Sequence, residues 1–219
     1  MVKVKICGIT NLADAKAALY FGADAVGFLI GKVHPSTGFF LNAEEARDII
    51  DHLPPFCSTV LVTHLSRPQE VVRTALEANV NTIQLHGDTT PEEAREIKQK
   101  LPNIKLYKVV HVFGEQAIAD AKMFEGAVEG IVLDTANRET GQVGGTGKTH
   151  DWSISQQLVK STSLPVILAG GLNPENVNEA ISKVRPYAVD VNSGVNNSDG
   201  TKDHQKLQSF IERAKGVNI

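Results

Sequence analysis

The sequence predicts an α/β fold, a single (β/α)8 TIM barrel that spans residues 1–219 as one domain. Short runs rich in Val, Ile and Leu alternate with longer amphipathic stretches along the whole chain, which is typical of strand–helix units repeated around a parallel sheet. Eight such runs are present, and that number favours a closed barrel. α/β barrels of this length commonly form one domain, and no linker interrupts the pattern.

Each expected element has a local reason. The expected strands are residues 3–7, 25–30, 58–63, 82–85, 105–110, 130–134, 166–169 and 188–191. Between them, helices are expected to begin at Asn11, Asn42, Thr90 and Asn173, because each of these residue types caps a helix N-terminus and acidic residues or proline follow closely. Acidic side chains in a first turn interact favourably with the helix dipole.

An open, doubly wound sheet is the alternative architecture. If it bound a dinucleotide, that sheet would normally carry a glycine-rich turn after its first strand. The corresponding turn here reads Cys7-Gly8-Ile9-Thr10, and no G-x-G-x-x-G motif follows any expected strand. The strand count and this turn together favour the barrel.

Composition narrows the classes of function. The formal net charge of -3 provides no basic field for nucleic acid, and no apolar run approaches the roughly 20 residues that span a membrane. The two cysteines, Cys7 and Cys57, have neither the number for a disulfide framework nor the spacing of a zinc site. We therefore expect a cytoplasmic protein, monomeric or homodimeric, that acts on a small molecule and binds neither nucleic acid nor membrane.

Candidate site residues follow from the fold, because barrels of this class place their active sites at the C-terminal ends of the strands. The chemically capable residues at those ends are Cys7, His64, His86, His111, Asp134, Gly170, Gly171, Asn192, Ser193 and Gly194. Glycine-rich turns after the last two strands expose backbone N–H groups and commonly bind phosphate. We expect Gly170, Gly171, Ser193 and Gly194 to bind the phosphate of a small phosphorylated substrate, although Gly170 and Gly171 also suit a simple tight turn.

Four segments of the chain resemble one family. They are Lys5-Ile-Cys-Gly-Ile-Thr10, Gln84-Leu-His-Gly-Asp88, Leu133-Asp-Thr135 with Gly144-Gly-Thr-Gly-Lys-Thr-His-Asp-Trp152, and Ala169-Gly-Gly-Leu-Asn-Pro-Glu-Asn-Val177 with Val189-Asp-Val-Asn-Ser-Gly-Val195. In this order and over nearly the whole chain, they are similar to the phosphoribosylanthranilate isomerase family of tryptophan biosynthesis.

The resemblance implies an Amadori rearrangement of N-(5-phosphoribosyl)anthranilate, an isomerisation in aromatic amino acid biosynthesis that needs no cofactor and no metal. It implies that Cys7 is the general base and Asp134 the general acid, and that His86 and Asp190 bind substrate. Both reagents need tuning, because a free thiol is mostly protonated and a carboxyl mostly ionised near neutral pH. A structural role remains the alternative for each, since cysteine often fills cores and aspartate often caps turns.

The chain departs from the family pattern in the loop after the second expected strand. In the family, that loop usually ends in Ser-x-Arg before an aromatic residue, and the Arg binds the anthranilate carboxylate of the substrate. Here Phe39 stands where the Arg is expected, so Lys32 is the expected substitute, with His34 as an alternative. The third strand commonly ends in Phe-x-Asn, whereas this one ends in Val62-Thr63-His64, and His111 is a further departure.

These departures leave other functions open. His64, His86 and His111 follow three adjacent strands, so a metal-assisted phosphosugar isomerase or epimerase with a different aglycone is one alternative. A catalytically silent phosphate-binding barrel is another, although the presence of both Cys7 and Asp134 argues against it. A Schiff-base aldolase is disfavoured, because Lys108 lies short of its strand end.

Overall fold

Eight parallel strands close into a barrel in the computed structural model, which describes residues 1–31, 40–137, 142–143 and 149–217. The order around the barrel is β1-β10-β9-β6-β5-β4-β3-β2. Its strands are β1 (Lys3–Ile6), β2 (Ala25–Leu29), β3 (Ser58–Thr63), β4 (Thr82–Leu85), β5 (Lys105–His111), β6 (Gly130–Asp134), β9 (Val166–Leu168) and β10 (Ala188–Val191). The predicted (β/α)8 barrel is confirmed, with every expected strand present to within one residue at each end.

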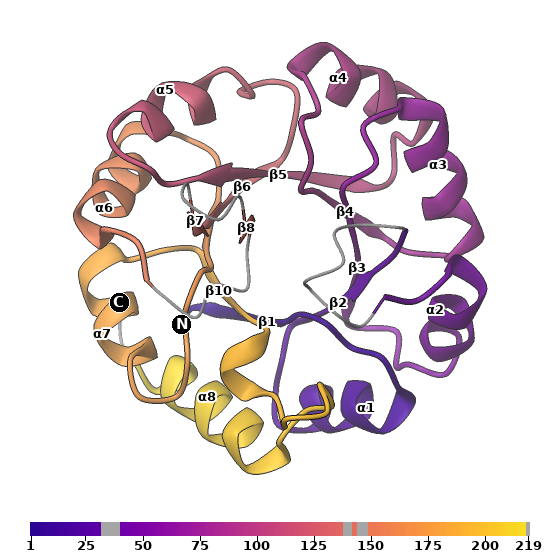
Figure 1. Cartoon of the computed structure of the whole chain (residues 1–219), viewed down its shortest axis with the longest axis vertical. Helices are drawn as coiled ribbons and strands as arrows, with labels where there is room; N and C mark the ends of the chain where they lie inside the picture. Colours follow the sequence, from indigo (N-terminus) through magenta and orange to yellow (C-terminus); the bar gives the residue numbers. More distant parts are fainter. Residues whose placement is uncertain (32–39, 138–141, 144–148, 218–219) are drawn as a thin grey trace.

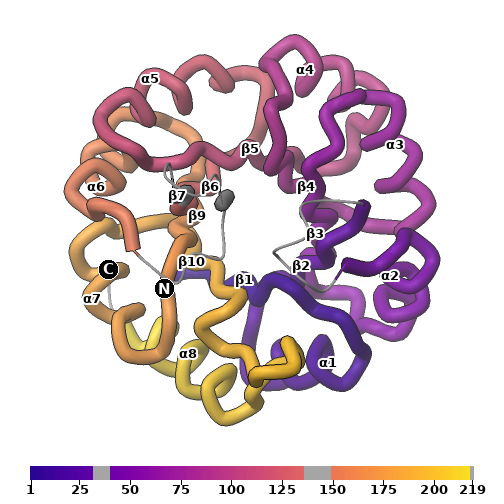
Figure 2. Tube along the Cα trace, viewed as in Figure 1, coloured from indigo at the N-terminus to yellow at the C-terminus, as the bar shows by residue number. Residues whose placement is uncertain are grey.

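Helices form a ring outside the strands, and they follow one another around it in chain order (Figures 1 and 2). They are α1 (Leu12–Tyr20), α2 (Ala43–Ile50), α3 (Pro68–Glu77), α4 (Pro91–Lys100), α5 (Gln116–Lys122), α6 (Trp152–Ser161), α7 (Val177–Val184) and α8 (His204–Gly216). A short antiparallel pair, β7 (Ala136–Asn137) and β8 (Gln142–Val143), follows β6, and a 3-10 helix, η1 (Ser193–Val195), follows β10. Among the described helices, none is both long and apolar enough to cross a membrane.

Three of the four predicted helix starts are confirmed. Asn11 caps α1, and Asn42 and Thr90 each form a reciprocal capping box at the start of α2 and α4. The fourth differs, because Asn173 caps a turn rather than a helix. Its side chain accepts hydrogen bonds from the backbone N–H groups of Glu175 and Asn176, and α7 begins only at Val177.

The barrel has two apolar layers because successive strand residues point to opposite sides of the sheet. The large outward-facing side chains, including Phe28, Leu61 and Ile83, are fully buried in the main core between the strands and the helix ring. Smaller groups fill the barrel interior, among them Val60 and Val132. Polar residues replace this inner layer toward the C-terminal strand ends, where the predicted site lies.

The opposite end of the barrel is open. A cavity of about 450 Å³ lies at the N-terminal strand ends, lined by apolar residues of the inner layer together with Lys5 and Gln84, and rimmed by Lys3, Phe56 and Tyr187. The Phe56 side chain is 100% exposed beside it. None of the predicted site residues that the structure describes lines this cavity.

Candidate functional site

The two predicted reagents lie at the mouth of the barrel, the end where the strands have their C-termini. Cys7 directly follows β1 and Asp134 ends β6, and both are buried. In the barrel, β9 and β10 separate them on one side and β2 to β5 on the other. The predicted phosphate loops, which follow β9 and β10, therefore lie between the strands of the two reagents.

A buried ion pair supports the Cys7 side of the mouth. The Lys5 ammonium donates to Asp190 Oδ2 over 2.7 Å, and both side chains are almost inaccessible. A Cβ at Gly27 would lie 3.1 Å from Lys5 Nζ and 3.2 Å from Cys7 Sγ, which places the ammonium and the thiol side by side. Lys5 therefore stands between an anionic carboxylate and the candidate base.

Opposing effects act on the protonation of this group of residues. Burial raises the pKa of the Cys7 thiol above its ordinary value, and the Lys5 ammonium acts against that rise. Burial alone would lower the pKa of Lys5, but Asp190 and Cys7 outweigh it, so the pKa of Lys5 is raised. Lys5 is thus a permanent cation that stabilises a thiolate at Cys7 once the proton has left.

Asp134 has the protonation state that a general acid needs. Burial is the main cause that raises the pKa of this carboxyl from 3.8 to about 7, and a hydrogen bond from the Thr135 backbone N–H partly offsets it. The His86 ring lies beside this carboxyl, with its Nε2 3.7 Å from Asp134 Oδ2. A large fraction of Asp134 is therefore protonated near neutral pH.

The glycines of the two predicted phosphate loops are required by geometry. Gly170 has a φ of +82°, and a Cβ there would lie 2.8 Å from the Thr135 backbone nitrogen and 3.1 Å from Asp134 Oδ1. A Cβ on Gly194, the middle residue of η1, would collide with the Leu172 carbonyl oxygen in the loop after β9. The two loops thus contact each other directly, and Ser193 is exposed beside them.

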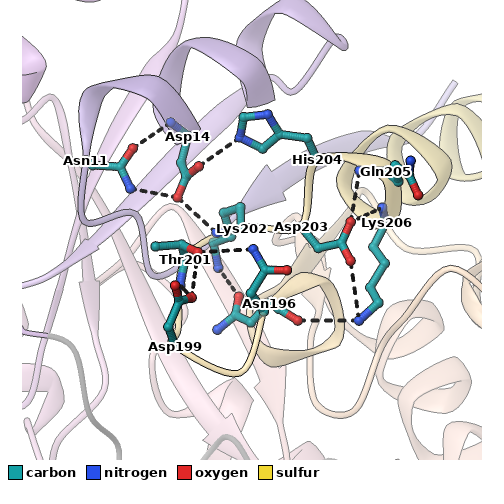
Figure 3. Close-up of polar contacts among 11 residues, drawn as sticks. Asn11, Asp14, Asn196, Asp199, Thr201, Lys202, Asp203, His204, Gln205 and Lys206 are labelled. Atoms are coloured by element: carbon teal, nitrogen blue, oxygen red, sulfur yellow. Dashed lines mark hydrogen bonds and ion pairs between the residues drawn. The ribbon is translucent and has the colours of Figure 1, made fainter.

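A second buried ammonium lies behind η1. Lys202 Nζ donates to Asn196 Oδ1 over 2.6 Å and to Asn192 Oδ1 over 3.1 Å, so it ties together the residues that flank η1. Burial lowers the pKa of Lys202 to about 8. Figure 3 shows that the Lys202 backbone N–H also donates to Asp14 Oδ2, which anchors this segment to α1. An ammonium behind a loop of backbone N–H groups favours an anion in front of it.

The three histidine rings lie in a row, but among the described residues they are not arranged as ligands of one metal ion. The His64 and His86 rings are stacked with centroids 4.5 Å apart, and the His86 and His111 centroids lie 5.5 Å apart. Stacked rings direct their nitrogens outward along the ring planes rather than toward a shared point. Within the described part of the chain, no group of three or more His, Cys, Asp or Glu side chains is placed to hold a metal ion.

Lys108 lies on the helix-facing side of β5, where its Nζ donates to the Gly87 carbonyl over 2.6 Å and burial lowers its pKa to about 8. It is therefore not aimed at the mouth as a Schiff-base lysine would be. Lys32, the expected partner of the substrate carboxylate, lies outside the described residues, as do His34 and Phe39.

Sequence reasoning missed Lys5 and Lys202. Lys5 lies two residues before Cys7 on the same strand, so strand alternation places both side chains on one face, and this signal was available. Lys202 lies in a connection of irregular backbone between η1 and α8, where no periodic pattern predicts which way a side chain points.

Known proteins match the chain over nearly its full length. The family model for N-(5'-phosphoribosyl)anthranilate (PRA) isomerase matches residues 4–213. The chain is 44% identical to N-(5'-phosphoribosyl)anthranilate isomerase 2 of Methanosarcina mazei over 98% of this chain and 94% of that protein. The crystal structure of the Thermotoga maritima isomerase superposes with a TM-score of 0.86 at 41% identity, covering 99% of this chain and 100% of the other.

A further solved structure bears on the ligand. It is a phosphoribosylanthranilate isomerase in complex with reduced 1-(o-carboxyphenylamino)-1-deoxyribulose 5-phosphate, with a TM-score of 0.84 and 38% identity, covering 99% of this chain and 100% of that one. The residues matched by the family model include residues of all eight barrel strands. This chain belongs to the N-(5'-phosphoribosyl)anthranilate isomerase family.

Proposed function

We propose that this chain rearranges N-(5'-phosphoribosyl)anthranilate to 1-(2-carboxyphenylamino)-1-deoxyribulose 5-phosphate, with Asp134 as general acid and Cys7 as general base. The proposal covers residues 1–219 as one domain with a cytoplasmic role in tryptophan biosynthesis. The observation that carries it is the pair of reagents on either side of the phosphate loops, one a carboxyl that keeps its proton near neutral pH and the other a thiol beside a buried ammonium.

The chemistry needs one proton delivered and one removed. Asp134 protonates the ring oxygen as the bond between that oxygen and C1' breaks, and the nitrogen lone pair forms a C1'=N bond. The Cys7 thiolate then takes the proton from C2', the C–H electrons form a C1'=C2' bond, and the nitrogen regains its lone pair. Tautomerisation of the resulting enol places a proton on C1' and leaves a ketone at C2'. Atoms and charge balance within the substrate and these two side chains.

The remaining site residues orient the substrate in this proposal. Gly170, Gly171, Ser193 and Gly194 bind the phosphate through backbone N–H groups, with Lys202 behind them. Asp190 has one oxygen bound to Lys5 and a second, buried oxygen without a partner among the described residues, which suits it to accept a bond from a sugar hydroxyl. His86 lies beside the acid.

The direct test is turnover by the purified chain. The anthranilate group is fluorescent, so conversion of phosphoribosylanthranilate is followed continuously, and the product, an isomer of the substrate with the same mass, is identified by chromatography and by its ketose chemistry. Complementation of a tryptophan auxotroph that lacks this isomerase is the parallel test in cells. No conversion by a folded, purified chain, together with no complementation, overturns the proposed function.

Substitution of Gly194 is expected to damage phosphate binding. The Cβ of Gly194→Ala has no room beside the Leu172 carbonyl, so η1 must move away from the loop after β9 and the N–H groups lose their alignment. We expect the KM to rise by about tenfold or more, as for loss of hydrogen bonds to a charged group, with a similar loss of competition by inorganic phosphate. Gly216→Ala is the matched control, because a Cβ there meets nothing within 4 Å. An unchanged KM in Gly194→Ala contradicts this phosphate site.

The pH dependence of kcat/KM is expected to be bell-shaped, with its acid-side break near 7. Asp134 acts protonated and Cys7 acts as a thiolate, but the pKa of Asp134, about 7, lies below the raised pKa of the thiol. Only a minority of molecules then hold both active forms, and that fraction is constant between the two pKa values. It falls tenfold per unit below pH 7 and above the thiol pKa. An acid-side break near the ordinary carboxyl value of about 4 would contradict this assignment.

The assembly is proposed as a monomer or a homodimer. One related solved structure is described as monomers generated from a dimeric phosphoribosylanthranilate isomerase, which supports the homodimer, and Phe56 is fully exposed at the rim of the cavity at the N-terminal strand ends. Sedimentation velocity of the purified chain distinguishes the two states.

A further inference from the structure

The wall of the mouth formed by β3, β4 and β5 consists of three imidazoles. His64 follows β3, His86 follows β4 and His111 ends β5, and their rings lie at centroid distances of 4.5 Å and 5.5 Å along the row. We call these three residues the histidine wall. Parallel strands that are adjacent in the barrel place the three side chains at similar heights above the strand ends.

Polar atoms of this wall lack partners. Both ring nitrogens of His86 and Nδ1 of His111 are buried without a hydrogen-bond partner in the described part of the chain. Burial lowers the pKa of His111 to about 4 and that of His86 well below its ordinary value, so both rings are neutral near pH 7. A neutral imidazole carries one N–H donor, and buried donors in native proteins almost always have an acceptor. These rings therefore fit a ligand that brings an acceptor with it.

The proposed function fixes how the bound substrate is oriented across the mouth of the barrel. The phosphate loops lie on β9 and β10, and the strands of the two reagents flank them. In the substrate, C1' bears both the ring oxygen that Asp134 protonates and the nitrogen of the aryl amine. The aryl group therefore begins three bonds from the ring oxygen that Asp134 protonates, and His86 lies 3.7 Å from that carboxyl on the side away from β9.

We propose that the histidine wall binds the carboxyphenyl group of the substrate, with the flat aryl ring against the imidazoles and an N–H group of His111 donating to the carboxylate. This inference rests on the proposed function and adds the residues that select the aglycone. The buried ammonium groups at the mouth have other partners, Asp190 for Lys5 and Asn192 and Asn196 for Lys202, so imidazole N–H groups are the donors that the wall itself offers.

The test compares two probes that differ only in the carboxylate. The first is reduced 1-(o-carboxyphenylamino)-1-deoxyribulose 5-phosphate, and the second is its phenylamino counterpart without the carboxyl group. Dissociation constants are measured for the wild-type chain and for His111→Phe, which keeps a flat ring and removes both nitrogens. We expect His111→Phe to raise the dissociation constant of the carboxylated probe by about tenfold to a hundredfold, as for loss of a hydrogen bond to a charged group. The dissociation constant of the other probe should rise by less than about threefold.

Two controls make the comparison specific. His52→Phe makes the same substitution at an exposed site at the end of α2, where His52 contacts only the Asp48 carbonyl in the hydrogen bonds described, and should leave both constants unchanged. Competition by inorganic phosphate reports whether His111→Phe keeps an intact mouth. His111→Asn, which retains an N–H donor on a smaller side chain, should recover part of the loss for the carboxylated probe.

Each outcome separates this inference from the proposed function. Equal weakening of both probes in His111→Phe assigns the residue a packing role and overturns the inference, as does an unchanged constant for the carboxylated probe. Either result leaves the proposed function standing if the wild-type chain converts phosphoribosylanthranilate. If the wild-type chain neither converts that substrate nor binds either probe, the proposed function fails and the inference fails with it.

Discussion

Replacement of Asp134 with alanine is expected to lower turnover by about 10²- to 10⁴-fold, the usual contribution of a positioned general acid. The ring oxygen of the substrate is a poor leaving group without a proton, and the carboxyl that supplies it is kept protonated by burial, with a pKa of about 7. The proton transfer develops in the transition state, so the affinity for product should stay within about tenfold of wild type. Single-turnover fluorescence measures the rate, and product inhibition measures the affinity.

Two further variants make this result specific. Asp134→Asn keeps the size of the side chain and its contact with the Thr135 N–H, but it cannot deliver a carboxylic proton, so we expect nearly the same loss. Asp120→Ala removes a partly exposed carboxylate on α5 that accepts a hydrogen bond from Gln116, and turnover should not change. Turnover near wild type in Asp134→Asn would remove this residue from the mechanism.

The fold was predictable from sequence because local and global signals agree. Each strand of a buried parallel sheet is covered on both faces, so it appears in the sequence as a short apolar run. Residues such as Asn11, Asn42 and Thr90 follow these runs and cap the next helix, so the local and the global signals agree. The predicted start of the helix at Asn173 was wrong, because an asparagine side chain accepts hydrogen bonds from backbone N–H groups in a turn as readily as in a helix. A capping residue therefore predicts that the chain changes direction, but it does not distinguish a turn from the start of a helix.

The site was predictable only in part, for a physical reason. Positions at strand ends follow from the fold class, so Cys7, Asp134 and the glycine loops could be named in advance. The protonation states of these residues could not be predicted, because they depend on burial and on neighbours from distant segments of the chain. Asp190 lies 185 residues from its partner Lys5, and Lys202 lies 188 residues from Asp14. No local pattern encodes such pairs.

The two buried ammonium groups have different tasks in the mouth. Lys5 is fixed by an anion and has a raised pKa, so it stays charged through the pH range of the reaction. Lys202 is held by neutral amide oxygens, and burial lowers its pKa to about 8, so its charge is less secure in the absence of an anion. A bound phosphate would supply that anion. The site is thus built so that substrate binding completes the charge balance on the phosphate side, whereas the reagent side is balanced in advance.

Replacement of Cys7 is expected to lower turnover as much as replacement of Asp134 does, and two variants of Cys7 test different properties of the thiol. Cys7→Ala removes the base, and turnover should fall by about 10²- to 10⁴-fold with product affinity within about tenfold. Cys7→Ser is nearly the same size but has a hydroxyl that ionises far less readily than a thiol, so we expect it to be almost as inactive. Stopped-flow fluorescence at saturating substrate measures both.

Cys57 provides the matched control for this prediction. Burial also raises the pKa of the Cys57 thiol, but that residue precedes β3 at the other end of the barrel, where it donates to the Pro54 carbonyl. Cys57→Ala should therefore keep wild-type turnover. A thiol-specific reagent should inactivate the wild-type chain and the Cys57→Ala variant at the same rate, and bound product should protect both. If Cys7→Ser instead retained most of the activity, the proton at C2' would have to leave by another route, and the Lys5 ammonium beside Cys7 would have no thiolate to stabilise.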